Sequence, residues 1–199
     1  QLARALFAAI AAVMITFSPD HSAAVGLAVF SGFAIATGLV FFAAAWLVFP
    51  AGRRAPAVLL GTIDLVAGMI AGVAGIRTDA LFFGLVIAWA VLSAIVEIVS
   101  GIRRLRTDDS VARAHARETL FVGILAGLLA LGIALVPTGF ALQYYIEDAG
   151  QSFTLTGITI AVGVFGAYAA IVAVYLAIAG FSPRSVSRVE EHRVTEGAS

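Results

Sequence analysis

The chain has 199 residues, of which 61% are hydrophobic and 12% are charged, with equal numbers of acidic and basic residues. Soluble domains carry about a quarter of charged residues, so this composition excludes an ordinary soluble protein and predicts an integral membrane protein. The chain contains no cysteine, which excludes disulfides, thiolate metal sites, iron–sulfur ligation and a cysteine nucleophile.

Six apolar stretches approach or exceed the roughly 20 residues that a helix needs to cross the hydrocarbon core. They cover residues 2–17, 23–49, 57–76, 80–102, 119–136 and 155–181. Prolines at positions 19, 50, 56 and 137 separate several of these stretches, because proline cannot continue the helical hydrogen-bond ladder. We therefore predict an all-α fold, an integral membrane bundle of six transmembrane helices.

The first stretch allows a second interpretation. Arg4, the apolar run after it and the sequence His21-Ser22-Ala23-Ala24 are compatible with a secretory signal and its cleavage site. Removal of this segment would leave five spans and would place the two termini on opposite sides of the membrane. We favour six spans, because five would break the hairpin pattern described below.

The basic residues predict an orientation. All twelve are arginine, and only Arg77 lies on the other side of the predicted spans from the rest. The remaining eleven are Arg4, Arg53, Arg54, Arg103, Arg104, Arg106, Arg113, Arg117, Arg184, Arg188 and Arg193. Positive residues in short loops stay on the cytoplasmic side, so both termini and a polar tail at 182–199 are predicted to be cytoplasmic.

The spans group into three predicted helical hairpins, residues 2–49, 57–102 and 119–181, which each enter and leave on the arginine-bearing side. A weak internal similarity favours a repeat. When residues 32–38 are laid over residues 88–94, Thr37 coincides with Ser93 and Gly38 with Ala94. The hairpins are therefore predicted to be copies of one structural unit.

The second hairpin closes with the motif SAIVEIVSGIRRLR, residues 93–106. This motif, with residues 84–92 before it and residues 6–46 around a Phe17-Ser18-Pro19 turn, resembles the HdeD-like acid-resistance membrane proteins, a short-repeat family of unknown function. The resemblance implies a six-helix protein of the bacterial inner membrane that is linked to acid stress and has no known catalytic residues. The third hairpin departs from the family pattern, because its outer loop is much longer.

Two carboxylates lie inside predicted spans, Asp64 in the third and Glu97 in the fourth. A charged group at membrane depth costs a few kcal/mol, so it usually faces the bundle interior or water. Counted from the turn at Thr78, the two differ in depth by about 5 residues, or roughly 7 Å. Asp64 is expected near the bilayer centre, level with Ser93, and Glu97 near the cytoplasmic surface.

Two interpretations of these acids remain open. In one, Asp64 is the central titrating group of a proton or cation relay, and Glu97 passes the ion to it from the cytoplasmic side. In the other, Asp64 is hydrogen bonded to Ser93, Thr62 or Thr37 as a link between helices. Glu97 is then neutralised by a snorkelling arginine, namely Arg104, Arg53 or Arg54. We favour the second, because a transporter should show broken helices or a more polar path.

Small residues predict where helices pack closely. Gly68 and Gly72 are four positions apart in the third span, and Gly123 and Gly127 repeat this spacing in the fifth. Such pairs allow close backbone approach where lipid removes the usual hydrophobic driving force. We expect packing within the bundle, with the seam of a homodimer as the alternative.

The longest connection, residues 138–156, is the candidate surface for an external partner, because long loops are often functional. Tyr144 and Tyr145 fit an aromatic belt at the membrane surface, which is the favoured interpretation of these two residues. Glu147 and Asp148 follow them, but two adjacent acids make a weak cation site.

Other partners and cofactors are mostly excluded. The five arginines between the fourth and fifth spans predict contact with anionic lipid. No aromatic stacking platform accompanies them, so nucleic-acid binding is not expected. The three histidines are spread over separate segments, so no metal site and no cofactor are predicted.

No nucleophile–base pair, metal motif or cofactor motif argues for an enzyme. The sequence therefore predicts a non-enzymatic, HdeD-like, multi-pass bacterial membrane protein. Its role would be structural or stress-related, or that of an accessory subunit of a larger membrane complex. Its expected protein partners are further copies of the chain, in a homo-oligomer, or the other subunits of such a complex. The alternative is a small transporter or a proton- or cation-conducting protein that uses Asp64 and Glu97.

Overall fold

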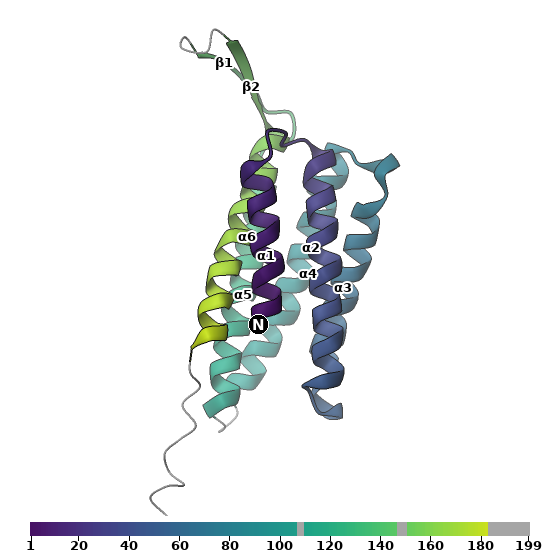
Figure 1. Cartoon of the computed structure of the whole chain (residues 1–199), viewed down its shortest axis with the longest axis vertical. Helices are drawn as coiled ribbons and strands as arrows, with labels where there is room; N and C mark the ends of the chain where they lie inside the picture. The colour runs from purple at the N-terminus through teal and green to yellow at the C-terminus, as the bar shows by residue number, and fades with distance from the viewer. Residues whose placement is uncertain (107–109, 147–150, 183–199) are drawn as a thin grey trace, which may run out of the picture.

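A computed structural model describes residues 1–106, 110–146 and 151–182 of the chain. These residues form six α-helices, two single 3₁₀ turns and one two-stranded antiparallel sheet (Figure 1). The helices are α1 (Leu2–Phe17), α2 (Ala23–Leu47), α3 (Ala55–Gly72), α4 (Asp79–Leu105), α5 (Ser110–Ala134) and α6 (Gly157–Phe181). The strands are β1 (Ala141–Ile146) and β2 (Gln151–Thr156).

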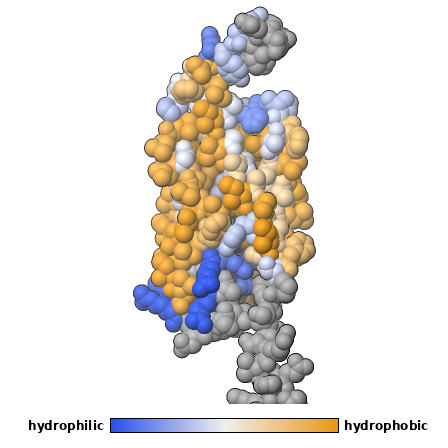
Figure 2. Space-filling model, turned by 90° about the vertical axis from the view of Figure 1, so that its left-hand side faces the viewer, coloured by the Kyte–Doolittle hydropathy of each residue, from blue (hydrophilic) through white to orange (hydrophobic). Residues whose placement is uncertain are grey.

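The helices have the length and the surface of membrane-spanning segments. Five of those described, α2 to α6, are long and apolar enough to cross a membrane, whereas α1 is an apolar helix of 16 residues. Many large apolar side chains are exposed on the outside of the bundle. On the face shown in Figure 2 they form a hydrophobic band, with hydrophilic residues gathered toward the ends. This surface fits lipid, not water, and the predicted multi-pass helical character is confirmed.

Local sequence signals account for where the helices begin. The side chains of Ser22, Thr78 and Thr156 precede α2, α4 and α6, and each accepts a hydrogen bond from a backbone N–H of the first turn. Such caps satisfy N–H groups that have no partner within the helix. Pro56 lies in the first turn of α3, where a missing N–H costs nothing. α5 begins nine residues before the predicted span 119–136 and carries Arg113 and Arg117 within it.

Three helix pairs pack most extensively: α2 with α3, α4 with α5, and α1 with α6. Glycine allows the close approach in each pair. A Cβ atom at Gly68 would lie 2.7 Å from Ile35, one at Gly123 would lie 2.9 Å from Glu97, and one at Gly166 would lie 2.7 Å from Ile15. The predicted grouping into hairpins 2–49, 57–102 and 119–181 is not confirmed, because the tightest contacts of α2 to α5 run across the arginine-bearing connections.

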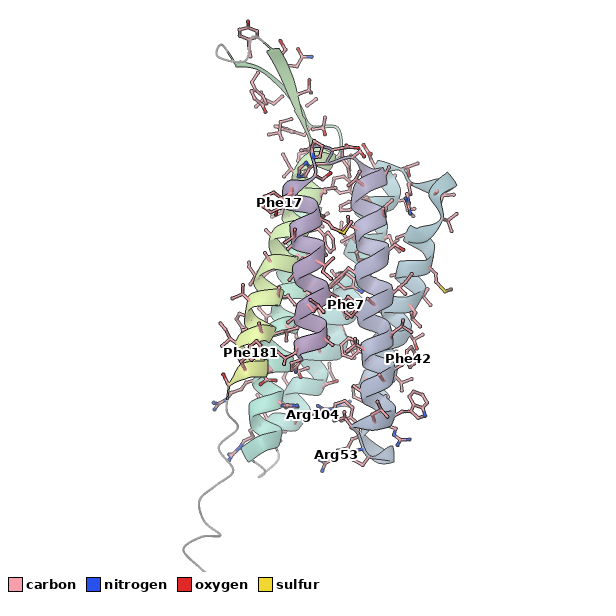
Figure 3. The ribbon with its side chains drawn as sticks, in the orientation of Figure 1. Phe7, Phe17, Phe42, Arg53, Arg104 and Phe181 are labelled. Carbon is pink, nitrogen blue, oxygen red and sulfur yellow. The ribbon has the colours of Figure 1, made fainter. Side chains whose placement is uncertain are left out.

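The two ends of the bundle differ in charge. The chain starts at the same end at which α6 finishes (Figure 1), and a Cβ at Gly180 would touch Leu2. Arg53 and Arg104 lie at this end, and Phe17 lies at the opposite one (Figure 3). The end that carries Arg53 and Arg104 is called the arginine end below.

Arg77, the exception among the arginines, has a local role at the other end. Its side chain donates hydrogen bonds to the carbonyl oxygens of Ala71 and Gly72, at 3.0 and 3.2 Å. These carbonyls end α3 and have no partner within the helix. Arg77 therefore caps α3, which explains an arginine outside the orientation pattern.

The long connection between α5 and α6 contains a β-hairpin that the sequence analysis treated as a loop. It projects beyond the end of the bundle (Figure 1), and its register pairs Tyr144 with Phe153. Alternating residues of a strand face opposite sides, so Tyr144 and Tyr145 lie on opposite faces of the hairpin. Glu147, Asp148 and all but the first residue of the predicted tail at 182–199 lie outside the described residues.

Candidate functional site

A stripe of polar and aromatic side chains runs down the inner face of α4. Trp89, Ser93 and Glu97 are four residues apart, a spacing that places them on one side of a helix. All three are buried, and Glu97 is only 3% exposed. Because each step of four residues descends toward the arginine end, the three side chains form a ladder from the middle of the bundle to that end.

Four other helices face this stripe and line a cavity with it, and α2, α3 and α6 contribute side chains at the same spacing of four. The cavity is lined by Arg4 from α1, Phe33, Thr37 and Phe41 from α2, Leu60 and Asp64 from α3, Trp89, Ser93 and Glu97 from α4, and Tyr168, Val172 and Leu176 from α6. The two intramembrane acids, which the sequence analysis separated by depth, therefore line one cavity.

Glu97 is paired with Arg4. A guanidinium N–H of Arg4 donates to Glu97 Oε1 at 3.2 Å, and the two side chains are 16% and 4% exposed. Arg4 also lies over the ring of Phe41, 4.3 Å from its centroid. A buried ion pair of this kind is costly to break, because one charge is then left without a partner.

The predicted partners of Glu97 were wrong. The expectation was a snorkelling arginine, Arg104, Arg53 or Arg54, from the same end of the membrane. Arg104 instead lies over the ring of Phe49, at 5.5 Å. The partner comes from α1, whose Arg4 side chain reaches Glu97, a contact that spacing within α4 cannot reveal.

Asp64 is held by Trp89. The indole Nε1–H donates to Asp64 Oδ1 at 2.6 Å, and Asp64 is 2% exposed. The predicted partners were Ser93, Thr62 and Thr37. Thr62 instead donates to the carbonyl of Val58 on its own helix, while Ser93 and Thr37 lie in the cavity wall without a hydrogen bond to Asp64.

Four buried polar atoms of the cavity residues have no hydrogen-bond partner within the described part of the chain. They are Asp64 Oδ2, Ser93 Oγ, Thr37 Oγ1 and Arg4 Nε. Unsatisfied buried polar atoms are rare in folded proteins and call for an explanation. The cavity volume of about 20 Å³ is enough for one water molecule, so the cavity combines unmet polar groups with room for a small polar occupant.

A larger groove connects this cavity with the arginine end. Its volume is about 310 Å³, and it shares Arg4, Phe41, Leu60 and Glu97 with the cavity. Its other lining residues include Gln1, Ser100, Arg104, His115 and Thr119. The buried acids are thus approached from one end of the bundle by a route with polar groups along it.

Aromatic rings close the cavity on the opposite side. Trp89 packs edge-to-face on Phe30, Phe33 and Tyr168, with ring centroids 5.1 to 6.1 Å apart. Phe165 packs in the same way on Phe30 and Phe33. These five side chains, Phe30, Phe33, Trp89, Phe165 and Tyr168, are called the aromatic cluster below. Because all five are buried, they separate Asp64 from the far end of the bundle.

The glycines predicted to mediate packing all face helices of the same chain. Positions 68 and 72 meet Ile35 and Ser31 of α2, and positions 123 and 127 meet residues of α4. The contact at Gly127 is loose, with Ala94 Cβ at 3.9 Å, whereas the one at Gly123 is tight. Packing within the bundle therefore uses these glycines, and the homodimer seam stays a prediction.

Sequence reasoning did not assign Arg4, Trp89 or Tyr168 to the site. Arg4 was used only for the orientation and for the secretory-signal interpretation, and neither aromatic residue was singled out. A signal for Trp89 was available, because Trp89, Ser93 and Glu97 share one helical face. No metal centre accompanies them: within the described ranges, no three residues among His, Cys, Asp and Glu cluster in a way that could hold a metal ion.

Comparison of the chain with protein-family models, with curated proteins and with solved structures found no match. The resemblance to HdeD-like proteins therefore rests on the sequence motifs alone. Function has to be argued from the site itself.

Proposed function

We propose that this chain is a multi-pass membrane protein that conducts or transports protons or another small cation, with Asp64 as its central binding group. One observation carries the proposal: Asp64 and Glu97 line a single buried cavity whose walls continue into a groove at the arginine end. Ionisable groups at membrane depth are expensive and mark ion pathways in many membrane proteins. This site holds two acids and one base.

Each residue of the site has its own role in the proposed transport. Glu97 receives the ion from the groove, and Arg4 orients the Glu97 carboxylate through their 3.2 Å contact. Asp64 binds the ion at the end of the route, and Trp89 holds one carboxylate oxygen so that the other faces the cavity. The aromatic cluster bars onward passage, so transport also requires a rearrangement that opens the other side, as in alternating access.

The orientation in the membrane is part of the proposal. The arginine end is taken as cytoplasmic. The start of α1 and the end of α6 then both lie on the cytoplasmic side. The membrane is taken as the bacterial inner membrane, with anionic lipid around the exposed arginines. In this orientation the groove opens to the cytoplasm.

A purely structural role is the second candidate. Each acid has a partner on another helix. Glu97 of α4 is bonded to Arg4 of α1, and Asp64 of α3 is bonded to Trp89 of α4. Such contacts can serve only to hold helices together. This is the non-enzymatic role that the HdeD-like resemblance implies, as a stress-related protein or an accessory subunit of a larger membrane complex.

Flux measurements separate the two candidates. The purified chain is reconstituted into vesicles that contain a pH-sensitive dye, and a pH gradient or a membrane potential is applied. The proposal expects flux in the parent protein and its loss in Asp64→Asn. The matched control is Asp79→Asn, the same change at an exposed residue of α4, which should retain flux.

Absence of flux in the parent, or full flux in Asp64→Asn, would overturn the transport proposal. Purification in mild detergent followed by native mass spectrometry then tests the structural candidate. Stoichiometric partner proteins would support an accessory subunit, and a clean isolated monomer would contradict it.

A further inference from the structure

We propose that the cavity beside Asp64 binds a single water molecule and that this water makes the site a proton path that excludes metal cations. The inference rests on the proposed function and narrows it, because it selects protons over other small cations. Three features of the site support a bound water: four buried polar atoms without partners, the volume of the cavity and the groove that leads to it.

The unmet hydrogen-bonding needs are of both kinds. Arg4 Nε–H is a donor without an acceptor, and the second oxygen of an ionised Asp64 is an acceptor without a donor. The hydroxyls of Ser93 and Thr37 also lack partners, and each can donate and accept. A molecule that meets all of these needs must itself donate and accept hydrogen bonds.

Water has this property, and a metal cation does not. A cation offers nothing to the N–H of Arg4, whose positive charge also repels it. Hard metal cations take six or more oxygen ligands, whereas Asp64, Ser93 and Thr37 supply three unpartnered oxygens. The volume of about 20 Å³ matches one water, which needs two to four polar partners. The volume of the cavity, the number of its unpartnered oxygens and the charge of Arg4 therefore all favour a water molecule over a metal cation.

The bound water joins the two acids into a proton path. A proton that arrives from the groove on the Glu97 side adds to the water oxygen. One of the other protons of this water then passes to Asp64 Oδ2, which gives a neutral carboxylic acid and a neutral water. Ser93 lies between Glu97 and Trp89 on α4 and orients the water. The net change is one proton moved, with no other bond made or broken.

The groups that face the water from each surrounding helix are few. α1 contributes Arg4, α4 contributes Glu97 and α6 contributes the hydroxyl of Tyr168, while α2 contributes no titratable residue to the cavity and α3 only Asp64 itself. Because Glu97 is paired with Arg4, it passes the proton on, and Asp64 is the carboxylate that keeps it at the end of the path.

The test combines infrared spectroscopy with ion replacement, on the full chain in vesicles. A pH-difference infrared spectrum should contain the C=O band of protonated Asp64, absent in Asp64→Asn, and a water O–H band that shifts in water labelled with ¹⁸O. The water band should shift in Ser93→Ala and in Thr37→Val, because the water loses one of its hydrogen-bond partners. The matched controls are Ser31→Ala, a buried hydroxyl bonded to Gly68 at 2.7 Å, and Thr62→Val, which should both keep the band.

Flux gives the second readout. Replacing sodium by potassium or by a large organic cation should leave the flux unchanged. Ser93→Ala should lower it by about tenfold, the rate equivalent of one hydrogen bond. Flux that depends on sodium, or a spectrum of the parent without an ¹⁸O-sensitive band, would overturn the inference. A water band without any flux would overturn the proposed function and leave the bound water standing.

Discussion

The interior of the bundle has two halves of opposite chemistry. Toward the arginine end it holds an ion pair, a second carboxylate, two hydroxyls and space. Toward the other end it holds the aromatic cluster, whose rings pack edge-to-face. Trp89 belongs to both halves, since its ring packs in the cluster while its Nε1–H binds Asp64.

The difference shows how one membrane bundle supports a costly polar site. Buried charges require partners and room for water, so they make the inner half open and loosely filled. In the outer half, close-packed rings supply stability without a buried charge. A one-sided route to a buried acid follows from this division, and variants on either side of Trp89 test it.

The largest effect is expected from breaking the ion pair. Arg4→Gln leaves Glu97 buried without a charged partner and should lower the free energy of unfolding by about 3 kcal/mol. The double variant Arg4→Gln/Glu97→Gln should recover much of this loss, because no unpaired charge remains. Denaturant unfolding in mild detergent measures both. Arg53→Gln, at an exposed arginine, is the control, and equal losses in the single and double variants would contradict a specific pair.

The next effect is expected in the aromatic half. Phe30 is fully buried, and Phe30→Ala should cost about 2 kcal/mol, less than in a soluble protein because the unfolded helices remain in lipid. The same change should increase proton leak through vesicles by loosening the barrier. Phe17→Ala, at a residue that is 79% exposed, is the control. A destabilised variant with unchanged leak would show that the cluster supports the fold alone.

Trp89→Phe tests the boundary between the halves. The ring is largely kept, but Asp64 loses its hydrogen bond, at a cost of about 1.5 kcal/mol. Trp46→Phe, at the other tryptophan and 60% exposed, should be near neutral. The expected change in proton flux is larger for Trp89→Phe than for Trp46→Phe, and equal effects on both readouts would argue against a role of the indole N–H.

The smallest effect on stability is expected where α5 packs against α4 beside Glu97. Gly123→Ala places a Cβ atom 2.9 Å from Glu97 Cβ, whereas Gly127→Ala meets only Ala94 Cβ at 3.9 Å. We expect a loss of about 1 kcal/mol for the first and a slight gain in helix stability for the second. Thermal unfolding of the two variants compares them directly. A reversed order would mean that α5 approaches α4 differently from the packing described.

Sequence reasoning placed the helices well because their signals are local. Apolar length and prolines act within a few residues, so five of the six helices lie close to the predicted spans, whereas α5 begins nine residues before its own. The depth estimate stays a prediction, since Ser93, expected level with Asp64, and Glu97, expected nearer the cytoplasmic surface, both line the cavity of Asp64. The β-hairpin was missed although the residues of β2, Ser152 to Thr156, alternate in polarity, a pattern typical of strands.

The composition and the arginine pattern by themselves determine a helical membrane protein with two unlike ends, because the cost of polar groups in lipid depends on residue type and not on partners. Only the tertiary structure decides that Arg4 meets Glu97, that Trp89 meets Asp64, and that the two acids share one cavity. These contacts join residues as far as 93 positions apart. They depend on how each helix is rotated, which glycine contacts between helices set and which spacing along one helix does not encode.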